Sequence, residues 1–281
     1  MAPIVVVIAA GEMGAAVGGR LREKGAEVRT SLLGRSAKTA ERAHRHGLTV
    51  INDDAELVAG ADFVLSIAPP AEAAPLARRL APALAGSTAK PVYVECNAVS
   101  PVTVAEAATV IGRTGCAFVD AGIIGGPPQP GLPGPRIYAC GPAMARFATL
   151  GDYGLDVRAL EGKIGTASAL KMAYGSITKG LTAIGASAIL GATAAGVADA
   201  LKRELADSQP ALKGWLDRQM PKMYAKAYRW IAEMEEVSAF LGKPSPSAQM
   251  YEGVARLYEQ LARSYEGDKK DIEALAAFVN R

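Results

Sequence analysis

A glycine-rich turn near the start of the chain has the residues that bind an anion. Residues 4–8 read IVVVI, and residues 9–14 read AAGEMG directly after them. In a strand-turn-helix dinucleotide site, three glycines allow a tight turn, approach of the backbone to the pyrophosphate, and close helix packing. Here only the first glycine is replaced, and alanine is tolerated there if its φ is negative. The expected cofactor contacts in this turn are Ala9, Gly11, Glu12, Met13 and Gly14.

The end of the second predicted strand discriminates between the two nicotinamide dinucleotides. About 20 residues beyond the glycines an NAD site places an acid on the ribose hydroxyls, but this chain has Arg35, Ser36 and Lys38. Guanidinium, hydroxyl and ammonium groups suit a 2′-phosphate through charge-assisted hydrogen bonds. The residues therefore favour NADP(H). The alternative is that Ser36 only caps the following helix and that Arg35 is solvated.

Apolar runs and amphipathic stretches alternate over the first 160 residues or so. Strands are expected at residues 4–8, 27–33, 63–67, 92–95 and 117–120, and helices at 12–24, 36–46, 71–84 and 101–112. Strands that are β-branched and apolar without alternation, separated by helices, indicate a parallel sheet covered on both faces. The fold class is therefore α/β, with a Rossmann-type doubly wound sheet in an NADP-binding domain over residues 1–162.

After residue 162 the pattern is helical only, which predicts an all-α second domain over residues 163–281 for substrate binding and dimerisation. Helices are expected at 165–206, 210–240, 246–265 and 268–280. Residues 180–198 carry no charge over about the length that could cross a bilayer. Their Ala, Gly, Ser and Thr content favours close helix packing over membrane insertion. We expect this helix to pair two copies in a homodimer.

Composition and charge narrow the class of partner. The 281 residues carry a formal net charge of +3 with both signs interspersed, which favours a small-molecule substrate and neither a nucleic acid nor a membrane. The three cysteines, Cys96, Cys116 and Cys140, have no metal-like spacing, and an odd number argues against a disulfide framework. We expect a cytoplasmic protein without a metal site.

Six motifs in order resemble those of the β-hydroxyacid dehydrogenase superfamily, which includes 6-phosphogluconate dehydrogenase and 3-hydroxyisobutyrate dehydrogenase. The family's G-x-G-x-M-G loop, its NADP-reading N-R-T and its strand end with a proline correspond to residues 9–14, 34–36 and 66–70. Its D-x-S-T-x-x-P, D-A-P-V-S-G-G and G-x-G-x-x-x-K correspond to residues 95–101, 120–126 and 165–171. Residues 171–180 and 229–236 resemble the subgroup with a C-terminal domain of unknown function numbered 1932.

The resemblance implies an NADP-dependent oxidoreductase that interconverts a hydroxy acid of the 3-hydroxy type and its oxo form by hydride transfer. It assigns Lys171 as the acid/base, with a pKa lowered by desolvation in an interdomain cleft. It also implies that Ala68 and Pro69 contact the cofactor. The substrate contacts that it implies are Asn97, Ser100, Gly125 and Gly126, of which Ser100 also precedes a proline as a helix cap.

One position departs from the family. An asparagine is expected four residues after the lysine, but this chain has Gly175. Tyr174 and Thr178 share the helix face of Lys171, and one of them is expected to supply the missing hydrogen bond to a changed or larger substrate; the alternative for Tyr174 is packing in the core. Two alternatives stay open: an imine reductase-like enzyme, since related reductases share this two-domain build, and a non-catalytic NADPH-binding regulator. The proline-dense residues 126–135 are either a stiff loop near the substrate or a surface connection.

Overall fold

The computed structural model describes residues 2–280 and divides into two compact units, Met1–Met172 and Ala173–Arg281. The division falls inside the long helix α7 (Thr166–Ala194), later than the boundary expected at residue 162. The reason is local: the first turns of α7 are hydrogen-bonded to the sheet of the first unit.

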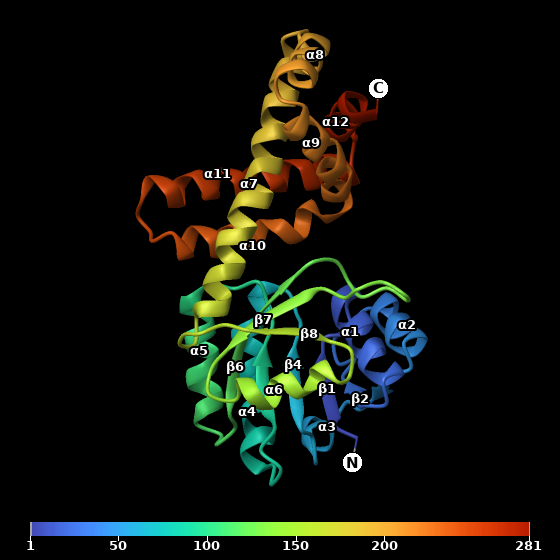
Figure 1. Cartoon of the computed structure of the whole chain (residues 1–281), viewed down its shortest axis with the longest axis vertical. Helices are drawn as coiled ribbons and strands as arrows, with labels where there is room; N and C mark the ends of the chain where they lie inside the picture. The colour runs from blue at the N-terminus through green and yellow to red at the C-terminus, as the bar shows by residue number, and fades with distance from the viewer. Residues whose placement is uncertain (1, 281) are drawn as a thin grey trace. The chain divides into compact units, whose positions relative to one another are not determined.

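The first unit is built on one eight-stranded sheet in the order β3-β2-β1-β4-β5-β6-β7-β8 (Figure 1). All neighbouring strands are parallel except the antiparallel pair β6 and β7. The strands are β1 (Ile4–Ile8), β2 (Glu27–Thr30), β3 (Thr49–Val50), β4 (Phe63–Ser66), β5 (Val92–Glu95), β6 (Phe118–Ile124), β7 (Arg136–Cys140) and β8 (Asp156–Ala159). The chain order reverses between β1 and β4, which is where doubly wound sheets bind ligands, beyond the carboxyl ends of the strands.

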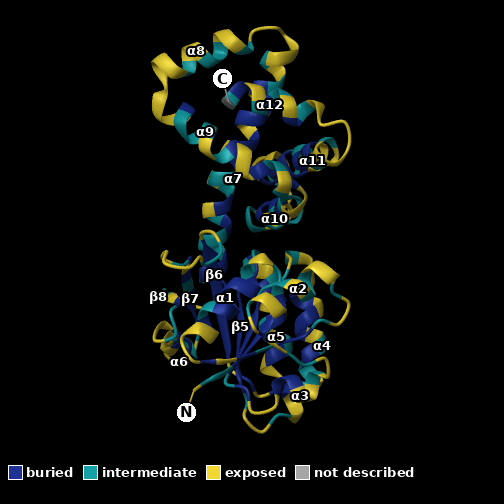
Figure 2. Cartoon of the chain, turned by 90° about the vertical axis from the view of Figure 1, so that its right-hand side faces the viewer, coloured by how far each residue is buried: buried dark blue, intermediate teal, exposed yellow. Residues whose placement is uncertain are grey.

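Helices cover both faces of this sheet, as the unalternating strands predict (Figure 2). Val5 and Val7 of β1 lie in a core with helices α1 and α6, whereas Val6 and Ile8 lie in a second core with α3, α4 and α5. The helical segments of this unit are α1 (Glu12–Glu23), α2 (Ala37–Arg45), α3 (Asp54–Val58), η1 (Pro70–Glu72), α4 (Ala73–Gly86), α5 (Pro101–Gly112), α6 (Met144–Ala148) and η2 (Thr149–Gly151). The expected Rossmann-type α/β architecture is confirmed.

The second unit contains helices only among the described residues. It comprises most of α7 together with α8 (Ala198–Ser208), α9 (Pro210–Met223), η3 (Tyr224–Lys226), α10 (Ala227–Phe240), α11 (Pro246–Glu266) and α12 (Lys270–Asn280). The single helix expected over 165–206 is wrong, because α7 ends at Ala194 and Gly196 adopts a positive φ of 74° before α8 begins. Glycine takes that left-handed conformation without a steric penalty, so the break is encoded inside an apolar run.

Helix α7 is the one helix within residues 2–280 whose length and composition would suit a membrane span. Two of its glycines lie against neighbouring helices: a Cβ on Gly180 would lie 2.8 Å from the Tyr251 hydroxyl, and one on Gly185 would lie 2.5 Å from Leu216. Lys179 of α7 also forms an ion pair with Glu233 of α10. The glycines therefore allow close helix approach, as the composition predicts.

Candidate functional site

Two glycines at the start of α1, Gly11 and Gly14, have different environments. A Cβ on Gly14 would lie 2.0 Å from the carbonyl oxygen of Ala9, so the packing of helix on turn requires glycine there. A Cβ on Gly11, the N-cap of α1, would meet no atom within 4 Å. The fold thus leaves open space at Gly11, at the amino end of a helix where backbone N–H groups attract an anion.

The alanine that replaces the first glycine fits its position. Among residues 2–280, the positive-φ residues other than glycine are Lys90 and Lys269, so Ala9 has the negative φ that alanine requires. Its N–H donates to the carbonyl of Ile67 at 3.1 Å, which joins this turn to the end of β4. Met13 packs against the core, while Glu12 is exposed in the first turn of α1.

The turn after β2 contains the basic residues expected to read a 2′-phosphate. Ser36 caps α2, because the Thr39 N–H donates to its Oγ at 3.4 Å, as the alternative interpretation expected. Arg35 is half-buried, and its guanidinium has no hydrogen-bond or ion-pair partner within residues 2–280. Lys38 is exposed on the first turn of α2. Ser36 thus caps the helix, while the side chains of Arg35 and Lys38 are available to a ligand.

Asn97 joins the ends of β4 and β5. Its Oδ1 accepts from the Ala68 N–H at 2.5 Å, and its Nδ2 donates to the Ser66 Oγ at 2.9 Å. Asn97 is only 3% exposed, so its amide chiefly fixes the backbone at the end of β4, directly before Pro69. Ser100 is buried and caps α5, accepting from the Thr103 N–H at 3.4 Å. Both predicted substrate residues thus have a structural part in the carboxyl edge of the sheet.

Glu95 at the end of β5 is a buried carboxyl that the sequence interpretation did not single out. Its Oε1 accepts from the Asn97 N–H at 2.9 Å, and its Oε2 has no hydrogen-bond partner in the described part of the chain. Burial raises the pKa of Glu95 to about 8, so at neutral pH the group is mostly the uncharged acid. The sequence signals for Glu95 were an acid at the end of an apolar strand and its place as the first residue of the motif at 95–101.

Asp120 of β6 anchors the start of α7. It is fully buried, and its Oδ2 accepts from the N–H groups of Gly165, Ala167 and Ser168 at 2.8, 3.0 and 3.2 Å. Its Oδ1 accepts from the Ser168 hydroxyl at 2.6 Å. A carboxylate at a helix amino end satisfies N–H groups that the helix itself cannot and is favoured by the helix dipole. Asp120 therefore fixes the turn of α7 that precedes Lys171.

Lys171 reaches the part of β6 that extends beyond its neighbour β5. The last residue of β6 that pairs with β5 is Asp120, so residues 121–124 extend beyond β5. Lys171 is half-buried, and its Nζ donates to the carbonyl oxygen of Ile123 at 2.5 Å. Burial lowers the pKa of Lys171 to about 8, because the charged ammonium is poorly solvated there. An amine that exchanges its proton near neutral pH can act as a general acid or base.

The residues expected to assist Lys171 lie further along α7. Tyr174 is exposed, and the Thr178 hydroxyl donates to the Tyr174 carbonyl at 3.0 Å, a common bond within a helix. A Cβ on Gly175 would meet no atom within 4 Å. The packing of α7 therefore does not require glycine at the position where the resemblance expected asparagine.

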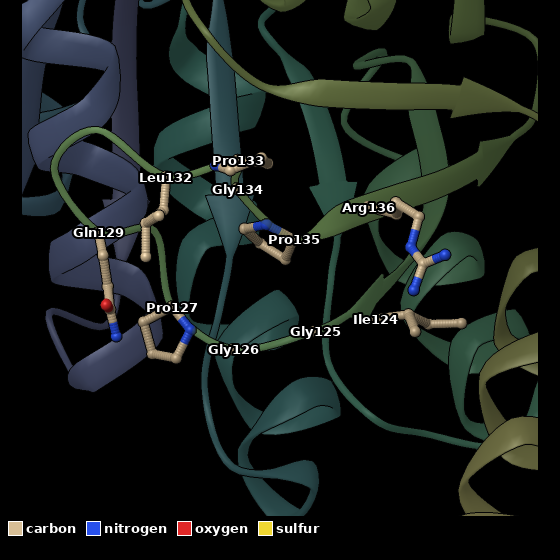
Figure 3. A pocket seen from close by; sticks show the side chains of 10 residues that line it. All are labelled: Ile124, Gly125, Gly126, Pro127, Gln129, Leu132, Pro133, Gly134, Pro135 and Arg136. Atoms are coloured by element: carbon tan, nitrogen blue, oxygen red, sulfur yellow. The ribbon is translucent and has the colours of Figure 1, made fainter.

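A pocket of about 270 Å³ lies beside the end of β6 (Figure 3). It is formed by the end of β6, the proline-rich loop and the first residue of β7, with the lining residues Ile124, Gly125, Gly126, Pro127, Gln129, Leu132, Pro133, Gly134, Pro135 and Arg136. The loop is tied to α1, because Arg20 Nη2 donates to the carbonyls of Gln129 and Leu132 at 2.9 and 3.1 Å. Gly125 and Gly126, which were expected to contact the substrate, follow directly after the last residue of β6 and line this pocket.

No group of three or more His, Cys, Asp and Glu side chains is placed to hold a metal ion within residues 2–280. The three cysteines are free and buried.

Comparison with protein families gives two matches. Residues 5–146 match the NAD binding domain of 6-phosphogluconate dehydrogenase, and residues 192–261 match a domain of unknown function (DUF1932). The first match runs from β1 to α6 and includes the glycine-rich turn, and it ends before β8 and Lys171. It supports a nicotinamide dinucleotide cofactor and an oxidoreductase.

Similar proteins include an uncharacterized 28.5 kDa protein of Methanothermus fervidus, 32% identical over 158 residues; the match spans 56% of this chain but only 59% of that relative's length. A solved conserved protein of unknown function, reported as structurally similar to 3-hydroxyacid dehydrogenases, is 29% identical with a TM-score of 0.67, covering 94% of this chain and 98% of its own. The Mycobacterium tuberculosis 3-hydroxyisobutyrate dehydrogenase with L-serine is 18% identical with a TM-score of 0.65, covering 100% and 99%. The last likeness concerns the fold.

Proposed function

Because the chain belongs to the family with the NAD binding domain of 6-phosphogluconate dehydrogenase, we propose that it is an NADP-dependent oxidoreductase that interconverts a hydroxy acid and its oxo form. The observation that carries this proposal is Lys171, an amine with a pKa of about 8 held at the carboxyl edge of a dinucleotide-binding sheet. The proposed substrate is a small molecule of the 3-hydroxy acid type.

The residues of the first unit fit the cofactor. The open space at Gly11 gives the pyrophosphate access to the N–H groups of α1, while Gly14 keeps the helix close to the turn. Ala68 and Pro69 line the same edge after β4. The unpartnered Arg35 guanidinium, with Lys38 and the Ser36 hydroxyl, would hold the 2′-phosphate that distinguishes NADP from NAD.

Lys171 handles the proton of the reaction. For oxidation, the neutral amine takes the hydroxyl proton as the carbon–oxygen double bond forms, and for reduction the ammonium returns that proton to the oxygen. The chemistry that bound NADP⁺ or NADPH supplies is acceptance or donation of the hydride, which carries the two electrons. The N–H groups of Gly125 and Gly126 are the proposed donors to the substrate carboxylate. Tyr174 and Thr178 are the proposed replacements for the missing asparagine.

The test is turnover of NADPH or NADP⁺ with a panel of 3-hydroxy acids and their oxo forms. We expect reversible activity that Lys171→Ala reduces by about 10²- to 10⁴-fold while NADPH binding, measured by fluorescence titration, is retained. Arg35→Ala is expected to lose the preference for NADPH over NADH. Activity on mixtures of ketones and amines alone would indicate an imine reductase, and tight NADPH binding without turnover on either panel would indicate a regulator; both results contradict the proposal.

We further propose that two copies pair through α7 and that the protein acts in the cytoplasm. Tyr174, Ile177, Leu181 and Ile184 form an exposed apolar stripe on α7 at helical spacing, and Ile177 is 63% exposed. Free buried cysteines fit a reducing compartment. A monomeric mass by light scattering at micromolar concentration would contradict the homodimer.

A further inference from the structure

The pocket beside the end of β6 contains one charged residue. Arg136 is the only ionisable side chain among the ten lining residues; the others are glycines, prolines, Ile124, Leu132 and Gln129. Arg136 is exposed, and its guanidinium has no hydrogen-bond or ion-pair partner within residues 2–280. An arginine stays protonated at all physiological pH values and presents a planar set of donors that matches a carboxylate or phosphate.

Strand register places Arg136 on the face of the sheet that α7 covers. Asp120 bonds to the start of α7, and a Cβ on Gly122 would lie 3.1 Å from the Cβ of Lys171, so both residues face α7. Alternation along β6 puts Ile124 on that same face. Arg136 is the cross-strand partner of Ile124, and opposite residues of an antiparallel pair share a face (Figure 3). The guanidinium and the Lys171 amine therefore lie on one side of the sheet, near one end of β6.

The two glycines of the pocket differ in what the fold requires of them. Gly125 has a positive φ of 132°, and a Cβ there would lie 3.1 Å from the Cα of Pro135, so the turn itself demands glycine. A Cβ on Gly126 would meet nothing within 4 Å. The backbone at Gly126 is thus open to a ligand, and the missing side chain has no packing explanation within the protein.

The walls of the pocket are preformed. The loop contains Pro127, Pro133 and Pro135, whose φ angles are fixed, and Arg20 of α1 holds its backbone at two carbonyls. A ligand that binds to a preformed wall loses less affinity to the ordering of the protein. The single unpaired cation and the open backbone together select for negative charge.

We propose that Arg136 binds a second anionic group of the substrate, a carboxylate or a phosphate, in addition to the carboxylate expected at the Gly125–Gly126 turn. The preferred substrates are then dianionic hydroxy acids, dicarboxylates or phosphate esters, rather than simple hydroxy acids. This inference rests on the proposed function for the identity of the reacting group, but the anion site itself follows from the pocket.

The test compares pairs of substrates that differ by the second anion. 3-Hydroxybutyrate and malate differ by a methyl against a carboxylate, and 3,4-dihydroxybutyrate is paired with its 4-phosphate. We expect the wild type to prefer the dianion of at least one pair, and the favoured pair identifies carboxylate or phosphate. Arg136→Gln is expected to lower kcat/KM for the dianion by about 10- to 100-fold and to change the monoanion by less than about twofold, since a charge-assisted hydrogen bond is lost.

A matched control removes the same charge elsewhere. Arg113 is an exposed arginine at the carboxyl end of α5, five residues before β6 begins and so near the end of β6 that lies away from the pocket. Arg113→Gln is expected to leave kcat/KM unchanged for both monoanionic and dianionic substrates. Gly126→Ala is expected to fold normally and to weaken binding of the dianion by filling the pocket. An unchanged substrate preference in Arg136→Gln, or a wild type that uses the monoanions equally well, would overturn the inference.

Binding without turnover separates the inference from the proposed function. Calorimetric titration with malonate and with inorganic phosphate is expected to show an affinity for one of them that Arg136→Gln weakens about tenfold or more. If that loss is seen while no hydroxy acid is turned over, the anion site stands and the proposed oxidoreductase chemistry fails. If hydroxy acids are turned over but neither anion binding nor kcat/KM depends on Arg136, only the inference is refuted.

Discussion

Replacement of Lys171 by arginine should remove the pH dependence of the proposed reaction near pH 8. Burial lowers the pKa of the Lys171 amine from 10.5 to about 8. At pH 7 a pKa of about 8 leaves roughly a tenth of the amine neutral, compared with about 0.03% for an unshifted lysine. The shift therefore increases the population of the base about 300-fold. Arginine keeps the positive charge but cannot lose a proton in this range.

The sign of the effect differs between the two directions of the reaction. In oxidation the neutral amine is the active form, so kcat/KM should rise about tenfold per pH unit below 8 and level off above it. In reduction the ammonium is the active form, so kcat/KM should be constant below pH 8 and fall above it. Initial rates followed by NADPH absorbance from pH 6 to pH 10 in both directions measure these profiles.

Glu95 provides the necessary control, because burial raises its pKa to about 8 as well. Glu95→Gln keeps a group of the same size that cannot titrate, and the break in the rate profile should persist in this variant. The break should be absent in Lys171→Arg, together with most of the activity. A break that survives in Lys171→Arg and vanishes in Glu95→Gln would refute the assignment of Lys171 as the acid/base.

Three further predictions concern the positions of the cofactor, the helix and the substrate. Gly14→Ala should lower the free energy of unfolding by about 1–3 kcal/mol in thermal denaturation, because its Cβ meets the Ala9 carbonyl, whereas Gly11→Ala should keep stability but weaken NADPH binding. Equal loss of stability in both would contradict the distinct roles. Asp120→Ala should lower the free energy of unfolding by about 3 kcal/mol or more, because buried donors at the start of α7 lose their acceptor, and Asp120→Asn should lower it less. An alanine variant that melts at the wild-type temperature would show that Asp120 does not anchor α7. Gly175→Asn should fold normally, since its Cβ position is open, and should shift the substrate preference toward smaller hydroxy acids; an unchanged kcat/KM ratio between small and large acids would show that this position does not set substrate size.

Strands of the first unit were predictable where they are apolar and continuous. β1 has the expected bounds, and β4 and β5 differ by at most one residue from expectation. β7 and β8 were not predicted. β7 directly follows the proline-rich loop and begins with the exposed Arg136, and β8 follows a helical turn and contains no buried residue. β6 continues four residues beyond its expected end. The extension contains Gly122, and glycine is unfavourable within a strand, but here it allows α7 to pack closely on β6.

The candidate site was predictable as far as local motifs reach. The glycines at 11 and 14 have environments that match the roles expected of them, and Lys171 lies at the carboxyl edge of the sheet. The partners of Asp120 at the start of α7 lie 45–48 residues away in sequence, so no local pattern indicates that it anchors α7. Arg136 has the same difficulty, because its relation to Gly126 arises only when β6 and β7 pair.

The bond between Asp120 and the beginning of α7 has a consequence for how such proteins can diversify. The amine of Lys171 is placed by the sheet, although most of the helix that carries it belongs to the helical unit that starts at Ala173. A recombination event after Met172 would transfer the nucleotide turn, the carboxylate anchor and the amine as one module. New helical partners could then be acquired, and with them new substrate ranges, without rebuilding the proposed reaction centre.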